Sequence, residues 1–378
     1  MEYKYLKDLA EIKMGQSPDS SSYNNEKKGL PFFQGNADFG ELYPISRVWC
    51  NSPKKIAEPG DILISVRAPI GALNYANTQC CIGRGLAAIS IIDETERKYI
   101  YYLLKAKNKE LNNSGTGSTF KAISKNVLED LQIPQISRLE QQKCMNLIDS
   151  LETIIRKRKK QLSQFDTLIK ARFVEMFGDP EINQKGWNEC SLSEKLNVVG
   201  GYAFKSDQFD EESGVPVLRI GNINAGFFRP VNLVYWQEDD SLEKYVMYPG
   251  DLVMSLTGTV GKDDYGNVCI LGDEYDKYYL NQRNAKLEIK GGIDKYYLSQ
   301  LLKFEQIKKR LTGISRGVRQ ANISNKDILN LVVPVPPMEL QNKFSDFIKQ
   351  VDKSKFAIQK ALDKAQLLFD SLMQKYFG

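Results

Sequence analysis

Arginine, glutamine and small hydroxyl side chains stand at corresponding places in two similar parts of this 378-residue chain. Gln34 follows the apolar run LPFF and Arg219 follows VPVL, whereas Arg67 follows DILISV and Thr257 follows DLVMSL. Arginine suits O6 and N7 of guanine, and glutamine suits adenine, because each side chain offers two adjacent hydrogen-bonding atoms. These residue types therefore favour recognition of a partner over the making or breaking of bonds.

Catalytic chemistry is restricted by the complete lack of histidine. Proton shuttles at neutral pH and most transition-metal sites use imidazole, so triad hydrolases and His-ligated metalloenzymes are excluded. The six cysteines form no CxxC pair and are expected to be reduced, structural thiols. The sequence also lacks an NPPY-type methyltransferase motif and a phosphate-binding GxxxxGKS/T loop. We therefore predict no catalytic, metal-binding or cofactor-binding residue.

Composition places the chain among ordinary globular proteins with two or three domains, at 42% hydrophobic and 26% charged residues. The formal net charge is +5, which permits a polyanionic partner without requiring one. The amino terminus lacks the apolar run of a signal peptide, and no later stretch approaches a membrane span. We expect a cytoplasmic protein that does not bind a membrane.

The chain repeats itself nearly from end to end. EPGDILISVRAPIG at 58–71 returns as YPGDLVMSLTGTVG at 248–261, and ARFVEMFG at 171–178 corresponds to SLMQKYFG at 371–378. Each copy starts with a varied, glycine-rich section that contains short apolar runs typical of strands. Each copy then ends with a long segment of helical period. The internal repeat therefore predicts two similar structural units, each with a strand-containing section followed by a long helix.

Both helical segments have apolar residues at alternating steps of four and three, the heptad spacing of a coiled coil. The first set is Cys144, Ile148, Leu151, Ile155, Leu162, Phe165, Ile169 and Met176, with Arg158 and Arg172 in the two missing places. The second set is Phe344, Ile348, Val351, Ile358, Leu362, Ala365, Phe369, Leu372 and Tyr376. Each segment predicts a helix of about 38 residues, which is roughly 57 Å long. They should pack antiparallel, because the section between them brings the chain back.

We therefore predict an α/β (α+β) fold with an internal pseudo-twofold repeat. Two globular α/β domains are joined by two long antiparallel coiled-coil helices. The predicted boundaries are 1–136 for the first domain, 137–178 for the first helix, 179–336 for the second domain and 337–378 for the second helix.

Several polar residues are expected to serve the backbone alone. Ser124 and Ser324 each precede a short helical stretch and should be N-caps, and Asp327 completes a capping box with Ser324. Asn36 and Asn222 follow glycine in a turn, where asparagine often bonds to nearby backbone.

In their order and repetition, these motifs resemble the specificity (S) subunit of type I restriction–modification systems along essentially the whole chain. The matching features are the paired PGD motifs, the GN turns at 35–36 and 221–222, IPQISRLEQQ and VPVPPMELQ before the helices, and MFGDPEINQKGW between the copies. The resemblance implies two target recognition domains, each of which reads half of a split DNA site. It also implies that the helices set the spacer and dock methyltransferase subunits.

The same resemblance implies a sequence-specific DNA-binding subunit without enzymatic activity. Its partners would be double-stranded DNA, two methyltransferase (M) subunits and, for cleavage, restriction (R) subunits. S-adenosylmethionine, ATP and Mg would be bound by those partner subunits only. Two alternatives remain open: a twin-domain scaffold that binds proteins, and an S-like specificity module of a fused nuclease or methyltransferase system.

Positions that are alike in both copies are candidates for phosphate contacts, since phosphates are uniform and base edges are not. When CIGRGLAAI at 81–89 is matched with LNQRNAKLEI at 280–289, Arg84 stands opposite Arg283. Both arginines are predicted to contact DNA. The alternative is that each arginine braces its own domain through a carboxylate.

Positions that differ between the copies are candidates for reading bases. Arg67 should project from the end of its strand, and the loop SRGVRQAN at 315–322 contains glycine and further arginines. The predicted DNA-binding residues of the first copy are Gln34, Arg67, Arg84, Ser118, Thr119 and Lys121. Those of the second copy are Arg219, Thr257, Arg283, Arg316, Arg319 and Gln320.

The run RKRKK at 156–160 places positive charges around more than one turn of the first helix. It is either a solvated helix face or a contact surface for DNA phosphates or an acidic partner. Because the run wraps around the helix, Arg158 must also face the seam.

The heptad spacing yields a first prediction. Removal of seven residues from each helix preserves the seam and shortens each helix by about 10 Å, or roughly three base pairs. The unread spacer of the methylated DNA motif should then shrink, or DNA binding should fail. Mapping of methylated bases checks this, and an unchanged spacer with normal affinity would exclude the helices as ruler.

Overall fold

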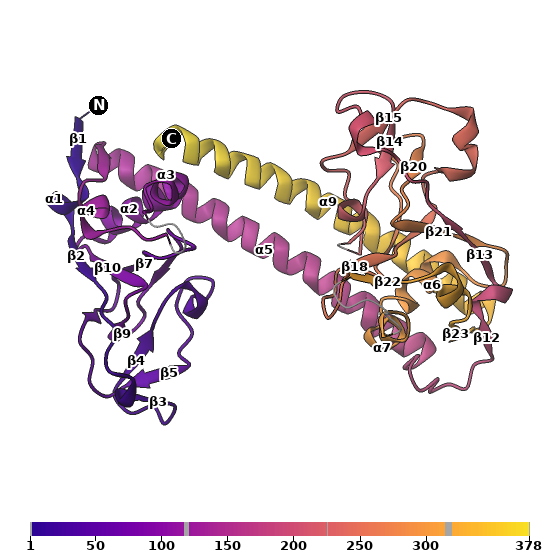
Figure 1. Ribbon diagram of the computed structural model, residues 1–378, viewed down its shortest axis with the longest axis horizontal. Coiled ribbons are helices and arrows are strands. Elements are labelled where there is room, and N and C mark those ends of the chain that lie inside the picture. Colours follow the sequence, from indigo (N-terminus) through magenta and orange to yellow (C-terminus); the bar gives the residue numbers. More distant parts are fainter. Residues whose placement is uncertain (1, 117–120, 225, 314–319, 378) are drawn as a thin grey trace. The chain divides into compact units, whose positions relative to one another are not determined.

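The computed structural model describes residues 2–116, 121–224, 226–313 and 320–377. Its contacts divide the chain into two compact units: unit 1 comprises Met1–Lys159 and Gln359–Gly378, and unit 2 comprises Lys160–Ile358. Figure 1 shows that each unit contains strands, short helices and part of both long helices. The predicted α/β fold with an internal repeat is confirmed. The domain boundaries remain a prediction, since each long helix is shared between the units.

The repeated PGD motif forms the same tight turn in both units. Gly60 and Gly250 have φ angles of 91° and 86°, a left-handed conformation that glycine adopts without strain. Asp61 and Asp251 then close the turn, because each carboxylate accepts a hydrogen bond at 2.9 Å from the backbone N–H three residues earlier. The motif recurs because both units need this turn before their central strand.

That central strand is β7 (Ile62–Ser65) in unit 1 and β17 (Leu252–Ser255) in unit 2, as the apolar runs predicted. None of the residues in β7 or β17 is more than 2% exposed. A continuous apolar run of this kind is typical of a strand covered on both faces.

Each central strand lies inside an antiparallel sheet, and the two sheets have equivalent orders. In unit 1 the order is β2 (Glu11–Met14), β10 (Leu86–Ser90), β7 and β8 (Leu73–Tyr75). In unit 2 it is β13 (Leu196–Gly200), β21 (Asn284–Ile289), β17 and β19 (Val268–Ile270).

A second, mixed sheet in each unit contains one parallel pair. In unit 1 the order is β3 (Tyr23–Asn24), β5 (Val48–Cys50), β4 (Leu30–Phe33), β9 (Cys80–Ile82) and β6 (Ile56–Ala57), with β4 parallel to β9. In unit 2 it is β15 (Val234–Trp236), β14 (Val215–Leu218), β20 (Tyr278–Leu280) and β16 (Val246–Met247), with β14 parallel to β20. The remaining ladders pair β1 (Glu2–Tyr5) with β11 (Gln132–Gln135), β12 (Glu189–Ser191) with β23 (Val332–Pro334), and β18 (Thr257–Thr259) with β22 (Gln320–Asn322).

Two long helices accompany shorter ones. The long helices are α5 (Arg138–Phe177) and α9 (Met338–Phe377). The short helices of unit 1 are α1 (Leu6–Leu9), α2 (Glu94–Ala106), α3 (Asn108–Asn113) and α4 (Lys125–Glu129). Those of unit 2 are α6 (Lys295–Leu301), α7 (Glu305–Thr312) and α8 (Asn325–Leu329).

The long helices run antiparallel in each unit, as the repeat predicted. In unit 2 the end of α5 meets the start of α9, where the rings of Phe173 and Phe344 are 5.5 Å apart. In unit 1 Lys105 of α2 bonds Glu152 of α5 at 3.0 Å and lies 5.4 Å from the ring of Phe369 of α9. Early residues of one helix thus lie beside late residues of the other.

The heptad pattern predicted most of the buried residues of the long helices. It did not include the buried phenylalanines near their carboxyl ends. Phe173, Phe177 and Phe377 are at most 5% exposed, whereas Met176 and Tyr376 are only partly buried. The last turns of each helix pack on a globular core as well as on the other helix. Their buried face is therefore wider than a two-position seam.

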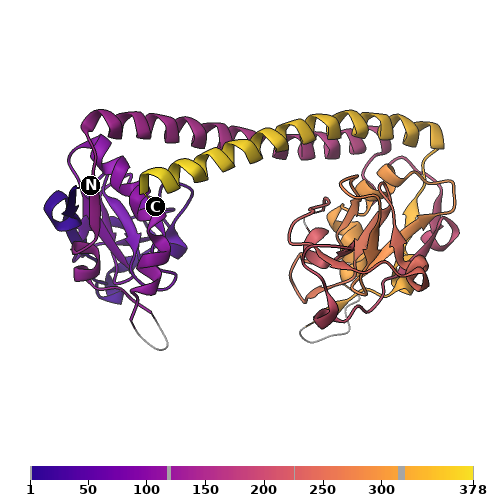
Figure 2. The ribbon, with the colours of Figure 1, turned by 90° about the horizontal axis from the view of Figure 1, so that it is seen from above.

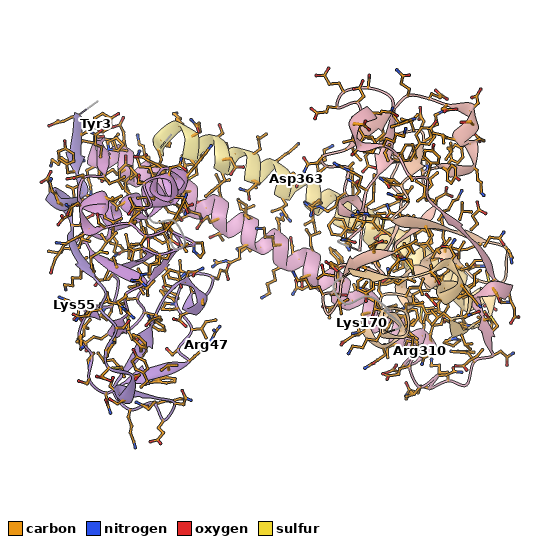
Figure 3. All side chains as sticks on the ribbon, in the orientation of Figure 1. Tyr3, Arg47, Lys55, Lys170, Arg310 and Asp363 are labelled. Atoms are coloured by element: carbon orange, nitrogen blue, oxygen red, sulfur yellow. The ribbon has the colours of Figure 1, made fainter. Side chains whose placement is uncertain are left out.

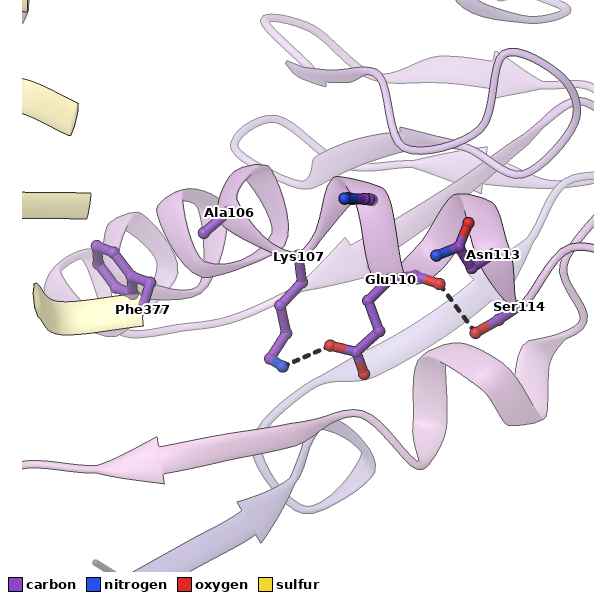
Figure 4. A pocket seen from close by; sticks show the side chains of 7 residues that line it. Ala106, Lys107, Glu110, Asn113, Ser114 and Phe377 are labelled. Atoms are coloured by element: carbon purple, nitrogen blue, oxygen red, sulfur yellow. Dashed lines mark hydrogen bonds and ion pairs between the residues drawn. The ribbon is translucent and has the colours of Figure 1, made fainter. Parts of the chain in front are cut away.

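An equivalent aromatic junction holds the end of each long helix. Tyr297 of α6 donates to the Pro334 carbonyl at 2.8 Å and lies 4.8 Å from the ring of Phe177. In unit 1 Tyr99 of α2 donates to the Pro134 carbonyl at 3.2 Å, with the Phe377 ring 5.2 Å away. Figure 2 shows the last turns of α9 beside the helices of unit 1, and Figure 4 shows Phe377 near Ala106 and Lys107. The end of α5 thus packs into unit 2 and the end of α9 into unit 1.

Two further expectations concern caps and thiols. Ser324 forms the predicted capping box with Asp327, whereas Ser124 occupies the N-cap position of α4 without a side-chain hydrogen bond to the helix. The cysteines are free, and burial raises the pKa of the Cys80 thiol to about 12. A thiol of this kind stays protonated and unreactive near neutral pH, as expected for a structural residue.

The aromatic junction yields a stability prediction. Phe173→Ala should lower the free energy of unfolding by about 3–5 kcal/mol, because it removes a fully buried ring from the core. Leu168→Ala is the matched control, since that side chain of the same helix is 47% exposed. Denaturant unfolding followed through tryptophan fluorescence checks this, because one of the three tryptophans, Trp187, donates from its indole to the Phe177 carbonyl at 2.8 Å. Equal losses for both variants would contradict the packing described.

Candidate nucleic-acid interface

Three strand ends meet at one edge of unit 1. Because β4 and β9 run parallel, Gln34 and Gly83 leave the sheet side by side, and the Gly83 N–H donates to the Phe33 carbonyl at 2.8 Å. The Val66 N–H, just beyond β7, donates to the Gly85 carbonyl at 2.9 Å and adds the third strand. We call this edge the strand-end rim of unit 1. Its polar residues are Ser17, Gln34, Arg67, Arg84 and Lys121.

The Gln34 side chain is held in a defined place on this rim. Ser17 Oγ lies 3.1 Å from Gln34 Nε2 and 3.2 Å from Gln34 Oε1, and the Arg84 N–H donates to the same hydroxyl at 3.3 Å. A Cβ at Gly83 would stand 2.5 Å from Gln34 Oε1, and one at Gly85 would stand 2.3 Å from the Gln34 carbonyl oxygen. Glycine is therefore needed at 85, which faces backbone, whereas a side chain at 83 would displace the Gln34 amide.

Positive charge surrounds Gln34. Arg67 and Lys121 lie on adjacent segments, because the Ala68 N–H donates to the Lys121 carbonyl at 3.0 Å. Arg67, Arg84 and Lys121 are exposed, and no carboxylate in the described part of the chain forms an ion pair with any of them. Uncompensated cationic side chains on one edge attract a polyanion.

The equivalent rim of unit 2 is built around Arg219, which follows β14. Its guanidinium donates to the Asn232 carbonyl, and its backbone N–H donates to Asn222 Oδ1 at 2.9 Å. Asn222 is 2% exposed and donates to the Arg229 and Val231 carbonyls at 2.9 and 3.0 Å. The expectation that Asn222 serves the backbone is confirmed.

Unit 1 fulfils the same backbone role with a different residue. Asp38 Oδ2, rather than Asn36, accepts from the Gln34 N–H at 2.7 Å. Both units thus fix the backbone just after the strand with a side-chain oxygen from the following short turn.

The predicted match of Arg84 with Arg283 is wrong by one residue. The Val66 N–H donates to the Gly85 carbonyl, and the equivalent Leu256 N–H donates to the Arg283 carbonyl at 2.8 Å. Arg283 therefore takes the place of Gly85, and Arg84 is equivalent to Gln282. Matching by identity aligned the arginines, whereas the ladder hydrogen bonds fix the register. Both arginines are exposed, but they do not form a symmetric pair.

Thr257 is equivalent to Arg67 as predicted but does not reach the surface. It is 8% exposed, and its hydroxyl oxygen lies 3.5 Å from Asn322 Oδ1. The reason is local: β18 and β22 form a ladder here, whereas at the equivalent place in unit 1 Arg67 and Ala122 form an isolated bridge. The buried Thr257 is not available for contact in this structure.

Four candidates lie outside the described residues, namely Ser118, Thr119, Arg316 and Arg319. Gln320 begins β22, but its side chain is likewise outside the description. The contribution of these residues to DNA binding stays a prediction. Gln34, Arg67, Arg84 and Lys121 are brought together in unit 1, and Arg219 and Arg283 belong to the rim of unit 2.

Ser17 and Gln282 belong to the rims but were missed in the sequence. Ser17 comes from a segment after β2, and the repeat matches it with Ala203, so neither identity nor charge drew attention to it. Gln282 was passed over because the adjacent Arg283 was taken as the partner of Arg84. The Gln282 N–H donates to the Tyr202 carbonyl at 2.8 Å.

Basic residues elsewhere have other surroundings. Along α5, Arg156, Lys157, Lys159 and Lys160 are exposed and Arg158 is half-buried, as expected if Arg158 turns toward the seam. Figure 3 labels Lys170 and Arg310 in unit 2. Lys170 Nζ lies 5.5 Å from the Phe304 ring, and Arg310 donates to the Glu181 carbonyl at 3.2 Å. Lys170 and Arg310 therefore support packing within unit 2.

Within the described ranges, no three Cys, Asp or Glu side chains gather closely enough to hold a metal ion. No helix there combines the length and the apolar character that a membrane span requires.

Comparison with known families matches nearly the whole chain. The family described as type I restriction modification DNA specificity domain matches residues 1–164 and again residues 184–367. The two matches correspond to the two copies of the repeat.

Two curated relatives are proteins of Methanocaldococcus jannaschii. The chain is 45% identical to the predicted MjaX type I restriction enzyme specificity subunit over 43% of this chain, and the alignment spans only 38% of that protein. It is 23% identical to the type I restriction enzyme MjaIX specificity subunit, over 98% of this chain and 91% of that protein.

A solved structure has the same fold. The crystal structure of the S subunit of a type I restriction–modification system from M. genitalium matches with a TM-score of 0.63 at 18% identity. The match covers all of this chain and 96% of the other.

The charged rim yields a binding prediction. Arg67→Ala, Arg84→Ala and Lys121→Ala should each weaken binding of the full chain to duplex DNA. Each variant should also reduce the slope of log affinity against log salt by about 0.9 for each phosphate that is no longer neutralised. Fluorescence anisotropy at several salt concentrations measures both quantities.

Lys28→Ala is the matched control for these variants. Lys28 is already paired with Glu26 at 2.5 Å and precedes β4, at the opposite end from Gln34. It should leave affinity and slope unchanged, and a loss equal to that of Arg84→Ala would contradict the rim as contact surface.

Proposed function

Since this chain belongs to the family of type I restriction modification DNA specificity domains, we propose that it selects the DNA sequence on which a methyltransferase acts. Each unit reads one half of a bipartite target through its strand-end rim. The chain itself performs no catalysis in this proposal.

The observation that carries the proposal is the pair of equivalent rims with unlike side chains. The parallel strand pairs and the bond donated by Val66 or Leu256 are equivalent in both units, but Gln34 is replaced by Arg219 and Gly85 by Arg283. A protein that reads two different half-sites is expected to repeat the same backbone arrangement and to carry different base-contacting side chains on it.

The partners follow from the proposed role. Double-stranded DNA binds the rims, and two methyltransferase subunits dock on the long helices, with restriction subunits added for cleavage. S-adenosylmethionine, ATP and Mg are then bound by those subunits, and the assembly works in the cytoplasm where the DNA is. The long helices support docking because they expose apolar side chains, such as Leu139 and Leu147 on α5, which are 65% and 49% exposed.

The decisive experiment is methylome sequencing of cells that carry the methyltransferase subunits with and without this chain. A bipartite motif should be methylated only when the chain is present. Methylation of the same motif without the chain would refute the proposed role.

Exchange of one unit's front section tests modularity. Replacement of residues 1–136 by the corresponding section of another family member should change one half of the methylated motif and leave the other half intact. The junction lies between β11 and α5, so both long helices are preserved. Exchange of 179–336 is the reciprocal control and should change only the other half. Simultaneous change of both halves by a single exchange would show that the units do not read separately.

A further inference from the structure

We propose that Gln34 and Arg219 are the equivalent base-reading side chains of the two units, Gln34 for adenine and Arg219 for guanine. We propose further that Ser17 is the positioning residue that orients the Gln34 amide. This inference rests on the proposed function and assigns it to particular residues and bases.

The equivalence of the two readers is fixed by strand register. Gln34 directly follows Phe33, which pairs in parallel with Ile82, and Arg219 directly follows Leu218, which pairs in parallel with Leu280. Both side chains are exposed at the point where the buried strand ends. Each is the first residue past its strand that can face a bound duplex.

The contacts of Ser17 hold the Gln34 amide in one place on the rim. The Ser17 oxygen accepts from the Arg84 N–H at 3.3 Å and from Gln34 Nε2 at 3.1 Å, and the hydroxyl proton can donate to Gln34 Oε1 at 3.2 Å. Gly83 packs against the other side, because a Cβ there would stand 2.5 Å from Oε1. The amide is therefore held before any partner binds.

This arrangement leaves the hydrogen-bonding groups that adenine requires. One Nε2 hydrogen is directed at Ser17 Oγ at 3.1 Å, so one lone pair of Gln34 Oε1 and the second Nε2 hydrogen remain available. Adenine offers the N6 amino group as donor and N7 as acceptor, which match them. Pre-ordering reduces the entropy lost when the side chain binds.

Arg219 is held in a different way at the equivalent position. One guanidinium N–H donates to the carbonyl of Asn232, a residue with a left-handed φ of 51°. Asn222 fixes the loop that carries this carbonyl through its bonds to 229 and 231. The remaining guanidinium donors are free to pair with O6 and N7 of guanine.

Reciprocal exchange of the readers tests the assignment. The full chain is expressed with its methyltransferase subunits, and methylated bases are mapped across the genome. Gln34→Arg should convert one adenine of one half-site to guanine, and Arg219→Gln should convert one guanine of the other half-site to adenine. Gln34→Ala should reduce discrimination at the same adenine by about five- to 150-fold.

The controls separate this inference from the proposed function. Gln79→Ala removes an exposed amide of unit 1 that bonds Glu58 at 3.1 Å, and it should leave the motif unchanged. The half-site not targeted by a variant reports whether the complex still folds and methylates. If the unmodified chain directs no methylation, the proposed function fails. If the chain directs methylation but Gln34→Ala and Gln34→Arg keep its motif and stringency, the reader assignment is overturned.

Ser17 is tested by removing and restoring its hydroxyl. Ser17→Ala should relax the adenine preference by about fivefold, the equivalent of one hydrogen bond, without change in the other half-site. Ser17→Thr keeps the hydroxyl and should restore the preference. An unchanged preference in Ser17→Ala, or equal relaxation in both variants, would overturn the positioning role.

Discussion

The parallel pairing of two buried strands is the constraint on which the candidate interface depends. Because β4 runs parallel to β9, and β14 to β20, the ends of both strands lie at the same edge of the sheet. Residues of these strands that face the core cannot contact a ligand. The first side chain that can do so is that of the residue just beyond each strand. A backbone bond from Val66 or Leu256 then adds the central strand to the same edge. The backbone of the rim therefore does not depend on which side chain stands at position 34 or 219.

The long helices depend on a second constraint, the burial of an aromatic ring at each end. Phe177 and Phe377 are equivalent in the repeat, and each packs on a tyrosine of the other copy, Phe177 on Tyr297 and Phe377 on Tyr99. Each long helix thus starts among residues of one unit and ends in the core of the other. Mutual exchange of helix ends explains why the repeat extends through the helices, since neither core is complete without a ring from the other copy.

Much of this could be predicted because it depends on local patterns. Heptad spacing located the two long helices, and the PGD turns located β7 and β17. Gln34 and Arg219 could be found because they directly follow strands. Ser17 could not, since its contact with Gln34 joins residues 17 positions apart in different elements. The burial of Thr257 likewise depends on the ladder between β18 and β22, which no local pattern in the sequence indicates.

The one-residue error at Arg84 and Arg283 has a physical meaning. In unit 1 the position after Arg84 must be glycine, because a Cβ there would collide with the Gln34 carbonyl oxygen at 2.3 Å. In unit 2 the same backbone position accommodates Arg283, so the strand end it faces must leave more room. In unit 1 the arginine, Arg84, precedes the residue whose carbonyl accepts the hydrogen bond from the central strand. In unit 2 Arg283 itself provides that carbonyl. Two rims with one backbone plan thus present different charge layouts as well as different readers, and each is suited to a different half-site.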